Sequence, residues 1–254
     1  MSAAKPAITV QNLTMGWDDR ILQKDASFEV QKSEVFAILG GSGCGKSTLL
    51  RYLIGLEKPM EGDIAIEGIG APDLAVGRPP FGVMFQSGAL FGSMTVGQNV
   101  GLGLRQWTDL PDDAVEAIVS GKLALVGLQG TEDKLPAELS GGMKKRAAIA
   151  RALALEPGLI FLDEPSAGLD PVSSAGLDEL ILTLNRVHGM TIILVTHELE
   201  SIYSVVGQCI YLDKESQSII ARGAPRELQE HSEHEKVRDF FNRRARQQND
   251  GDEK

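Results

Sequence analysis

Short apolar runs recur along the chain, and each run ends in a glycine-rich or polar turn. Three runs are almost wholly apolar, which is typical of strands covered on both faces of a sheet; they lie at residues 35–39, 159–162 and 191–195. Between them, apolar residues recur at helical spacing, most clearly over residues 46–54, 112–155 and 173–187. Strands that alternate with helices predict an α/β fold with a mostly parallel sheet.

The flanking segments carry other patterns. Residues 8–13 alternate between apolar and polar side chains, which predicts a half-buried strand at the edge of a sheet. Further short strands are predicted at residues 26–30, 62–66 and 82–85. The helical pattern breaks around residues 127–140, and we expect the helices between about residues 87 and 150 to form a lobe of their own.

The end of the chain is highly charged after Pro225. Residues 231–246 predict one amphipathic helix whose apolar face is formed by Val237, Phe240 and Phe241. This face has two interpretations, because it can pack on its own domain or contact another protein molecule. Residues 1–7 are predicted to be flexible and residues 247–254 to be disordered.

Composition narrows the class of protein. Of the 254 residues, 43% are apolar and 24% charged, which excludes a wholly disordered chain. The 25 Lys and Arg against 35 Asp and Glu give a net charge of −10, which argues against nucleic acid as a partner. Two cysteines, Cys44 and Cys209, are too few for a disulfide framework. We expect a cytoplasmic protein, because the start lacks a signal peptide and no apolar run reaches the roughly 18 residues that cross a bilayer.

The strongest chemical signal is a glycine-rich segment between a predicted strand and a predicted helix. It fits the pattern G-x-x-x-x-G-K-[ST], in which backbone N–H groups surround a polyphosphate, the lysine reaches the β- and γ-phosphates and the serine hydroxyl ligates Mg²⁺. A plain glycine-rich turn is the alternative, but the flanking elements favour nucleotide binding. The predicted nucleotide-contacting residues are Gly40, Gly41, Ser42, Gly43, Cys44, Gly45, Lys46, Ser47 and Thr48.

Two acidic residues follow the apolar run at 159–162. Asp163 is placed to hold Mg²⁺ through water or through Ser47. Glu164 is a candidate to orient or deprotonate the attacking water, which requires hydrogen-bond reach and a suitable pKa. The alternative is a strand that simply ends in polar residues, and the phosphate loop elsewhere in the chain argues against it.

A second glycine turn, Ser140-Gly141-Gly142, precedes the helical residues 144–155. Ser140 is a natural N-cap, and the two glycines leave the first amides of the helix uncovered, so the turn is a second anion site. One ATP has no need of two glycine loops in one subunit. We therefore predict a head-to-tail dimer, with each ATP between the phosphate loop of one chain and the Ser-Gly-Gly turn of the other. Taken alone, such a cap is usually structural.

In this order and spacing, the motifs resemble those of the ATP-binding subunits of ABC transporters over residues 8 to about 223. The resemblance implies a P-loop fold with a mostly parallel sheet, antiparallel edge strands and a helical subdomain at about residues 87–150. The ATP-binding domain would span residues 8–230, followed by the charged helix and tail at residues 231–254. The ABC core is complete without that helix, which favours the intermolecular interpretation of its apolar face.

The resemblance also assigns roles to residues that mean little alone. Residues 166–170 match the D-loop, which crosses to the partner chain. Gln86 would otherwise be a surface residue and His197 a structural one. The catalytic residues implied are Lys46, Gln86, Glu164 and His197. The Mg²⁺ ligands implied are Ser47, Gln86 and Asp163.

Two further residues near the predicted site keep open interpretations. Trp17 resembles the aromatic residue that stacks on adenine, although its loop is about one residue short, and a core or surface tryptophan is the alternative. Cys44 lies within the phosphate loop. A small residue tolerated at a variable position is the favoured interpretation. The other is a reactive thiol of lowered pKa at a helix N-terminus.

Met143 stands where most of the family carries Gln. Together with residues 88–91, 93–96 and 197–201, it resembles the Mla/Mce branch, whose members energise lipid transport across cell envelopes. This implies ATP and Mg²⁺ as cofactors, a two-copy permease, an MCE-domain lipid-binding protein, a STAS-domain accessory subunit and a peripheral position at the cytoplasmic face of the inner membrane. Apolar residues between Gln86 and Val100, Phe91 among them, are expected to contact the permease.

Three other functions are weighed against lipid transport. The first is an importer for an amino acid or another small polar solute. The second is a non-transport ABC ATPase, but such proteins carry coiled-coil insertions or tandem ATPase domains, which are absent from this sequence. The third is a degenerate structural subunit, and the intact Lys46, Asp163, Glu164 and His197 argue against it.

Overall fold

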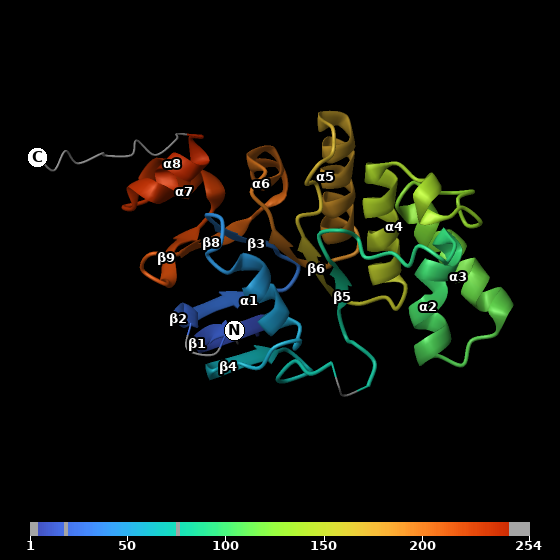
Figure 1. Cartoon of the computed structure of the whole chain (residues 1–254), viewed down its shortest axis with the longest axis horizontal. Helices are drawn as coiled ribbons and strands as arrows, with labels where there is room; N and C mark the ends of the chain where they lie inside the picture. The colour runs from blue at the N-terminus through green and yellow to red at the C-terminus, as the bar shows by residue number, and fades with distance from the viewer. Residues whose placement is uncertain (1–4, 18–19, 75–76, 244–254) are drawn as a thin grey trace, which may run out of the picture.

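The computed structural model describes residues 5–17, 20–74 and 77–243. A six-stranded sheet in the order β5-β6-β7-β3-β8-β9 forms the centre of the molecule (Figure 1). Its strands are β3 (Val35–Gly40), β5 (Gly82–Met84), β6 (Leu159–Asp163), β7 (Thr191–Val195), β8 (Gln208–Asp213) and β9 (Ser218–Gly223). All neighbours are parallel except β8 and β9, which confirms the predicted mostly parallel α/β sheet.

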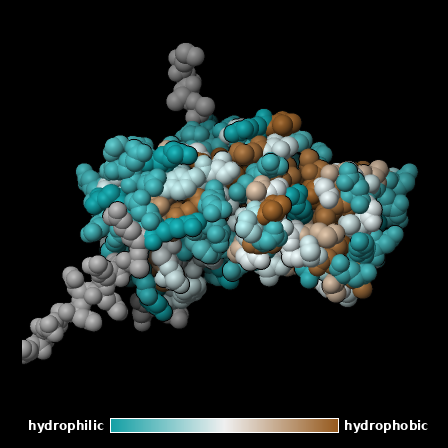
Figure 2. All heavy atoms as spheres, turned by 90° about the horizontal axis from the view of Figure 1, so that it is seen from above, coloured by the Kyte–Doolittle hydropathy of each residue, from teal (hydrophilic) through white to brown (hydrophobic). Residues whose placement is uncertain are grey.

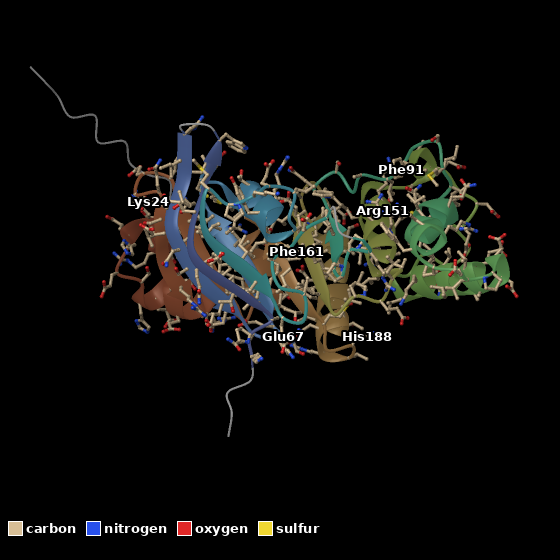
Figure 3. The ribbon with its side chains drawn as sticks, turned by 90° about the horizontal axis from the view of Figure 1, so that it is seen from below. Lys24, Glu67, Phe91, Arg151, Phe161 and His188 are labelled. Carbon is tan, nitrogen blue, oxygen red and sulfur yellow. The ribbon has the colours of Figure 1, made fainter. Side chains whose placement is uncertain are left out.

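Strand β3 is apolar throughout because its two faces enter two different cores. Phe36 and Ile38 pack with helix α1 (Lys46–Leu53) and the N-terminal strands. Ala37 and Leu39 point to the other face, where the remaining helices cover the sheet. Figure 3 shows Phe161 of β6 near the middle of the molecule, and its side chain belongs to the core that Phe36 and Ile38 share with α1. Burial on both faces explains why these strands carry no alternating pattern.

A separate antiparallel sheet lies beside α1 in the order β2-β1-β4. Its strands are β1 (Ile8–Trp17), β2 (Arg20–Val30) and β4 (Glu61–Ile66). The predicted edge position of the first strand is wrong, because β1 is the middle strand: Ile8 pairs with Val30 on one side and with Ile66 on the other. An alternating pattern reports which face of a strand is buried, and it carries no information about how many neighbours the strand has.

Helices α2 (Val96–Trp107), α3 (Asp112–Leu125) and α4 (Gly141–Leu153) pack together beyond β5 and are called the helical lobe here (Figure 1). A 3₁₀ turn, Pro136–Glu138, leads into α4. The apolar residues of the lobe continue into the core on one face of the central sheet, which α5 (Pro171–Arg186) and α6 (Leu199–Val205) also cover. Among the described helices, none has both the length and the apolar composition that crossing a bilayer requires.

The C-terminal segment differs from its prediction in two ways. One helix over residues 231–246 was expected, whereas the described part forms α7 (Pro225–His231) and α8 (Glu235–Phe241), and residues 244–254 lie outside the described residues. The apolar face is also covered by its own domain, since Val237 is 0% and Phe241 2% exposed. Phe241 packs on Tyr203 of α6 and Phe240 on Tyr211 of β8. The favoured intermolecular role of this face is therefore wrong, because two distant tyrosines supply its partner surface.

Candidate nucleotide-binding site

The phosphate loop joins β3 to α1 and keeps its backbone accessible. A Cβ on Gly40 (φ 146°) would lie 2.4 Å from the carbonyl oxygen of Leu212, so only glycine fits there. Gly45 is left-handed (φ 103°) and no side chain caps α1, which leaves the first amides of the helix available to an anion. The ammonium of Lys46 donates hydrogen bonds to the carbonyl oxygens of Gly40 (2.8 Å) and Gly41 (3.1 Å). A cation and free amides therefore meet at one point, as phosphate binding requires.

Ser47 and Asp163 bring together the oxygen atoms that Mg²⁺ prefers. Asp163 ends β6, and the Ser47 hydroxyl donates a hydrogen bond to its Oδ1 over 3.3 Å. Burial raises the pKa of the Asp163 carboxyl, and the hydrogen bond from Ser47 opposes that shift. A hydroxyl and a carboxylate beside the phosphate loop fit a hard divalent cation. The side chain of Gln86 is exposed and has no hydrogen-bond partner within the described ranges, so its part in metal binding stays a prediction.

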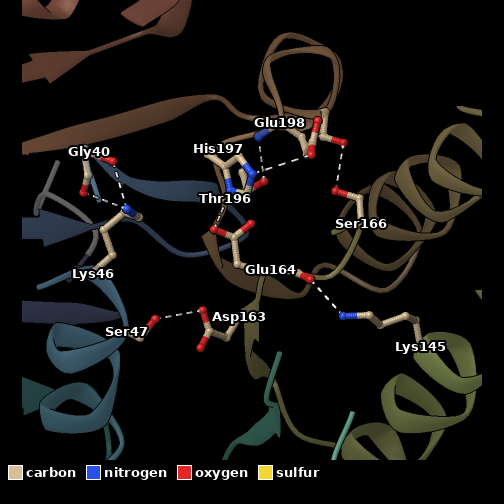
Figure 4. A network of polar contacts seen from close by, with 12 residues as sticks. Gly40, Lys46, Ser47, Lys145, Asp163, Glu164, Ser166, Thr196, His197 and Glu198 are labelled. Atoms are coloured by element: carbon tan, nitrogen blue, oxygen red, sulfur yellow. Dashed lines mark hydrogen bonds and ion pairs between the residues drawn. The ribbon is translucent and has the colours of Figure 1, made fainter. Parts of the chain in front are cut away.

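Glu164 and His197 form the polar pair next to this position (Figure 4). Glu164 follows β6 and is only 7% exposed, whereas His197 follows β7 and its ring is largely open to solvent. Oε1 of Glu164 lies 2.8 Å from Nδ1 of His197, while Oε2 is buried and has no hydrogen-bond partner among the described residues. One carboxylate oxygen is thus oriented by the imidazole and the other is a buried acceptor without a partner among the described residues, so the role of Glu164 as a general base stays a prediction.

The second glycine turn lies on the helical lobe. Ser140 is confirmed as the N-cap of α4, since its Oγ accepts a hydrogen bond from the N–H of Met143 over 3.3 Å. Gly141 is exposed, so the first turn of the helix is accessible. No hydrogen bond or ion pair within the described residues connects the Ser140 side chain to Lys46 or Glu164. The structure therefore brings Lys46, Asp163, Glu164 and His197 together (Figure 4), whereas the hydrogen bond that the Ser140 side chain makes within the described residues is its own helix cap.

The structure decides between some of the alternative interpretations of Trp17 and Cys44. Trp17 lies at the end of β1 and is 47% exposed, which excludes the core interpretation. Stacking on adenine stays a prediction, and a surface tryptophan remains its alternative. Cys44 is 1% exposed, and burial raises the pKa of its thiol although Lys46 opposes the shift. The interpretation of Cys44 as a reactive thiol of lowered pKa is therefore wrong, because desolvation outweighs the nearby cation and the helix N-terminus.

Sequence reasoning missed Lys145 on α4. Its side chain is buried, and its ammonium donates hydrogen bonds to the main-chain carbonyl oxygens of Glu164 (3.0 Å) and Gln86. A signal was present, because Lys145 shares a helix face with the buried Ala148 and Ile149 at positions i+3 and i+4. A lysine on the apolar face of a helix indicates a specific buried acceptor.

These features define an ATPase of the P-loop class: a glycine loop with its lysine, an acidic strand end and a histidine within hydrogen-bond reach of the second carboxylate. The family model for the ABC transporter matches residues 23–167. The chain therefore belongs to the ABC transporter family and is an ATP-hydrolysing subunit of that family. ATP-binding subunits of this family work as dimers with a membrane permease.

Several curated proteins are similar over most of the chain. The probable ribonucleotide transport ATP-binding protein mkl of Mycobacterium leprae is 41% identical, over 94% of this chain and 69% of its own length. The intermembrane phospholipid transport system ATP-binding protein MlaF of Haemophilus influenzae is 39% identical, over 87% and 85%. The putrescine transport ATP-binding protein PotG of Escherichia coli is 39% identical, over 90% and 60%. Identity alone does not separate these three transport functions.

Solved structures share the fold. The ATP-binding cassette MJ0796, in a dimeric post-hydrolysis state bound to ADP and Pi, matches with a TM-score of 0.76 and 29% identity over 85% of this chain and 98% of that chain. The cbiO1 protein of Clostridium perfringens, part of the cbiONQ transporter complex, matches with a TM-score of 0.77 and 32% identity over 87% and 90%. Both likenesses extend beyond the phosphate loop to nearly the whole domain.

Proposed function

We propose that this chain energises phospholipid transport across the bacterial cell envelope. It acts as a pair of copies bound to a permease, at the cytoplasmic face of the inner membrane, with an MCE-domain lipid-binding protein and a STAS-domain subunit as further partners. The observation that carries the proposal is Met143 in the Ser-Gly-Gly motif, at the position where most of the family carries Gln. Similarity to the MlaF proteins of two bacteria, over 85% and 88% of their lengths, supports it.

A small polar solute is the second candidate substrate. It is supported by the similarity to the putrescine protein PotG, at the same 39% identity as the MlaF protein of Haemophilus influenzae. The ribonucleotide assignment of mkl points to a third, also polar, substrate. The ATPase chemistry is the same in every case, so the experiment that separates these substrates must identify the companions of the chain.

Hydrolysis follows from the placement of the chain's own groups. Lys46 exchanges its loop carbonyls for phosphate oxygens, and the first amides of α1 stabilise the negative charge that builds up there. Mg²⁺, held by Ser47 and Asp163, would supply further charge neutralisation. The Glu164 carboxylate accepts the proton of the attacking water, while His197 holds its Oε1 in place. Two copies that each carry a net charge of −10 repel after phosphate release, which reopens the pair.

The test is to purify the subunit from its native membrane in mild detergent and identify its companions. We expect a permease and an MCE-domain protein, and an ATPase rate that rises when phospholipid is included in proteoliposomes. Recovery of a soluble solute-binding protein, with stimulation by putrescine or an amino acid and none by phospholipid, would support the second candidate and reject the first.

The permease contact has its own prediction. Hydrophobic side chains gather on the half of one face that carries the helical lobe, and the other half is mostly hydrophilic (Figure 2). Phe91 is 52% exposed, and two hydrogen bonds to the buried Asn99 side chain hold its backbone in place. The N–H of Phe91 donates to Asn99 Oδ1 (2.8 Å), and Asn99 Nδ2 donates to the carbonyl oxygen of Phe91 (3.1 Å). Figure 3 shows Phe91 and His188 on different sides of the molecule. Val187, which precedes His188 in the sequence and is exposed, is therefore a suitable control position away from Phe91.

Phe91→Asp should therefore prevent assembly with the permease and leave ATP binding by the isolated chain unchanged. Val187→Asp, which adds the same charge at an exposed apolar position elsewhere, should assemble normally. The measurement is co-purification of the permease with each variant, alongside nucleotide affinity of the free subunit. Full assembly of the Phe91→Asp protein would remove Phe91 from the proposed interface.

A further inference from the structure

Helix α4 contacts the segment that carries Glu164 through the side chain of Lys145. Lys145 is 9% exposed, and its ammonium donates a hydrogen bond to the carbonyl oxygen of Glu164 (Figure 4). It also donates a hydrogen bond to the carbonyl oxygen of Gln86. Burial lowers the pKa of Lys145, while the nearby carboxylates of Asp163 and Glu164 oppose the shift. A buried ammonium is costly unless it is hydrogen-bonded, so its two backbone acceptors are the reason that this cation is tolerated.

One of those acceptors belongs to a strained residue. Glu164 has a positive φ of 48°, a conformation that residues other than glycine adopt only when their surroundings enforce it. Its N–H donates to the carbonyl oxygen of Val195 over 2.8 Å, and its own carbonyl oxygen accepts from Lys145. The peptide groups on both sides of Glu164 are thus held. This restraint fixes the direction in which the carboxylate leaves the backbone toward His197.

The same helix holds a second strained residue in the segment after Gln86. Arg151 donates to the carbonyl oxygens of Ala89 (2.6 Å) and Gly88 (2.9 Å), and Ala89 also has a positive φ of 48°. Two cations of one rigid helix therefore fix the backbone of residues 86–89, and one of them fixes Glu164 as well. A shift of residues 86–89 relative to α4 would disturb the ammonium that also holds Glu164.

We propose that Lys145 is a positioning residue for ATP hydrolysis, which places the Glu164 carboxylate only when the segment at residues 86–89 is seated on α4. Among the described residues, no hydrogen bond or ion pair joins Lys145 to the phosphate loop, whose own Lys46 donates to the carbonyl oxygens of Gly40 and Gly41. The hydrolysis step therefore depends on Lys145, and ATP binding does not.

The test uses Lys145→Met, which keeps length and apolar volume and removes the donors. We expect kcat to fall roughly 10- to 100-fold, because a displaced general base loses its alignment with water. The Kd for ATP should stay within about twofold, as expected for an interaction that matters only in the transition state. Lys145→Arg should recover most of kcat, because it restores a cationic donor. Amide hydrogen exchange should accelerate at residues 86–91 and 164–167 in Lys145→Met.

Lys122→Met is the matched control. Lys122 is a partly buried lysine of the same lobe, and its ammonium lies 3.1 Å from Oε1 of Glu156. This variant should leave kcat and exchange at residues 164–167 unchanged. The proposal is rejected if Lys145→Met retains wild-type kcat, if ATP affinity falls as much as kcat, or if Lys145→Arg is as slow as Lys145→Met. Should Lys145→Met fail to fold, Lys145→Gln, whose uncharged side chain is one atom shorter and is not expected to reach both carbonyl oxygens, should still lower kcat with the Kd for ATP within about twofold. A wild-type kcat in Lys145→Gln would then reject the proposal.

Discussion

Two helix N-termini in this chain offer backbone amides to an anion, and they differ in every other respect. At α1 the preceding Gly45 is left-handed, no side chain caps the helix, and Lys46 lies over the loop. At α4 the preceding Ser140 is extended and caps the helix with its own hydroxyl. Lys46 is therefore positioned to bind phosphate directly, whereas at α4 the uncharged Ser140 hydroxyl already accepts a hydrogen bond from an amide of the helix.

The surroundings sharpen the contrast. Asp163, Glu164 and His197 lie around the N-terminus of α1, whereas no hydrogen bond or ion pair in the described ranges links them to the Ser140 side chain. A turn that offers amides without a bonded catalytic group agrees with the predicted head-to-tail pair, in which a second chain would supply that group. The dimeric, ADP- and Pi-bound state of the similar cassette MJ0796 is consistent with such a pair. The difference teaches that similar helix ends acquire different functions from their neighbours.

The largest expected effect is at the N-terminus that carries the machinery. Glu164→Gln keeps size and hydrogen bonding to His197 but removes the charge that accepts a proton, so kcat should fall by about 10²- to 10⁴-fold. ATP binding should persist and a closed, ATP-bound dimer should accumulate, measured by nucleotide affinity and size-exclusion chromatography. Lys46→Ala serves as the contrasting control, since it should weaken nucleotide binding itself. Near-normal turnover in Glu164→Gln would show that another group activates the water.

The second prediction tests whether the N-terminus of α1 in one chain and the N-terminus of α4 in another form one site. Ser140→Arg should block hydrolysis and leave ATP binding by the monomer nearly intact, because the bulky cation obstructs only the neighbouring chain's site. An equimolar mixture with Lys46→Ala should restore about one quarter of wild-type turnover, since half of the dimers then contain one intact site of two. Each variant alone is the control. Absence of complementation, in a mixture shown by mass spectrometry to contain heterodimers, would break the head-to-tail arrangement.

The smallest expected effect is on stability, and it tests whether the Ser140 hydroxyl stabilises α4. Ser140→Ala removes the hydrogen bond to the N–H of Met143 and should lower the free energy of unfolding by about 1 kcal/mol, whereas Ser140→Gly should cost only a few tenths. Urea unfolding of the two variants measures this difference. Both should retain more ATPase activity than Ser140→Arg. An unchanged stability in Ser140→Ala would show that the hydroxyl does not stabilise its own helix.

The sequence by itself determined the phosphate loop, the two acidic residues Asp163 and Glu164 at the end of β6 and the cap of α4. These features are local, because each depends on residue types at fixed spacing and on strands that end at the same edge of a parallel sheet. The mostly parallel sheet followed from the same regularity, since the three apolar runs became β3, β6 and β7.

Only the tertiary structure decided what lies beside each local feature. The position of β1 between two partners, the burial of Phe241 on Tyr203 and the raised pKa of Cys44 all depend on residues distant in sequence. Lys145 shows the limit most clearly, because helical spacing places it on an apolar face but cannot identify the carbonyl oxygens that it binds. Periodicity records which side chains are covered, whereas the identity of the covering group is set by how separate segments pack.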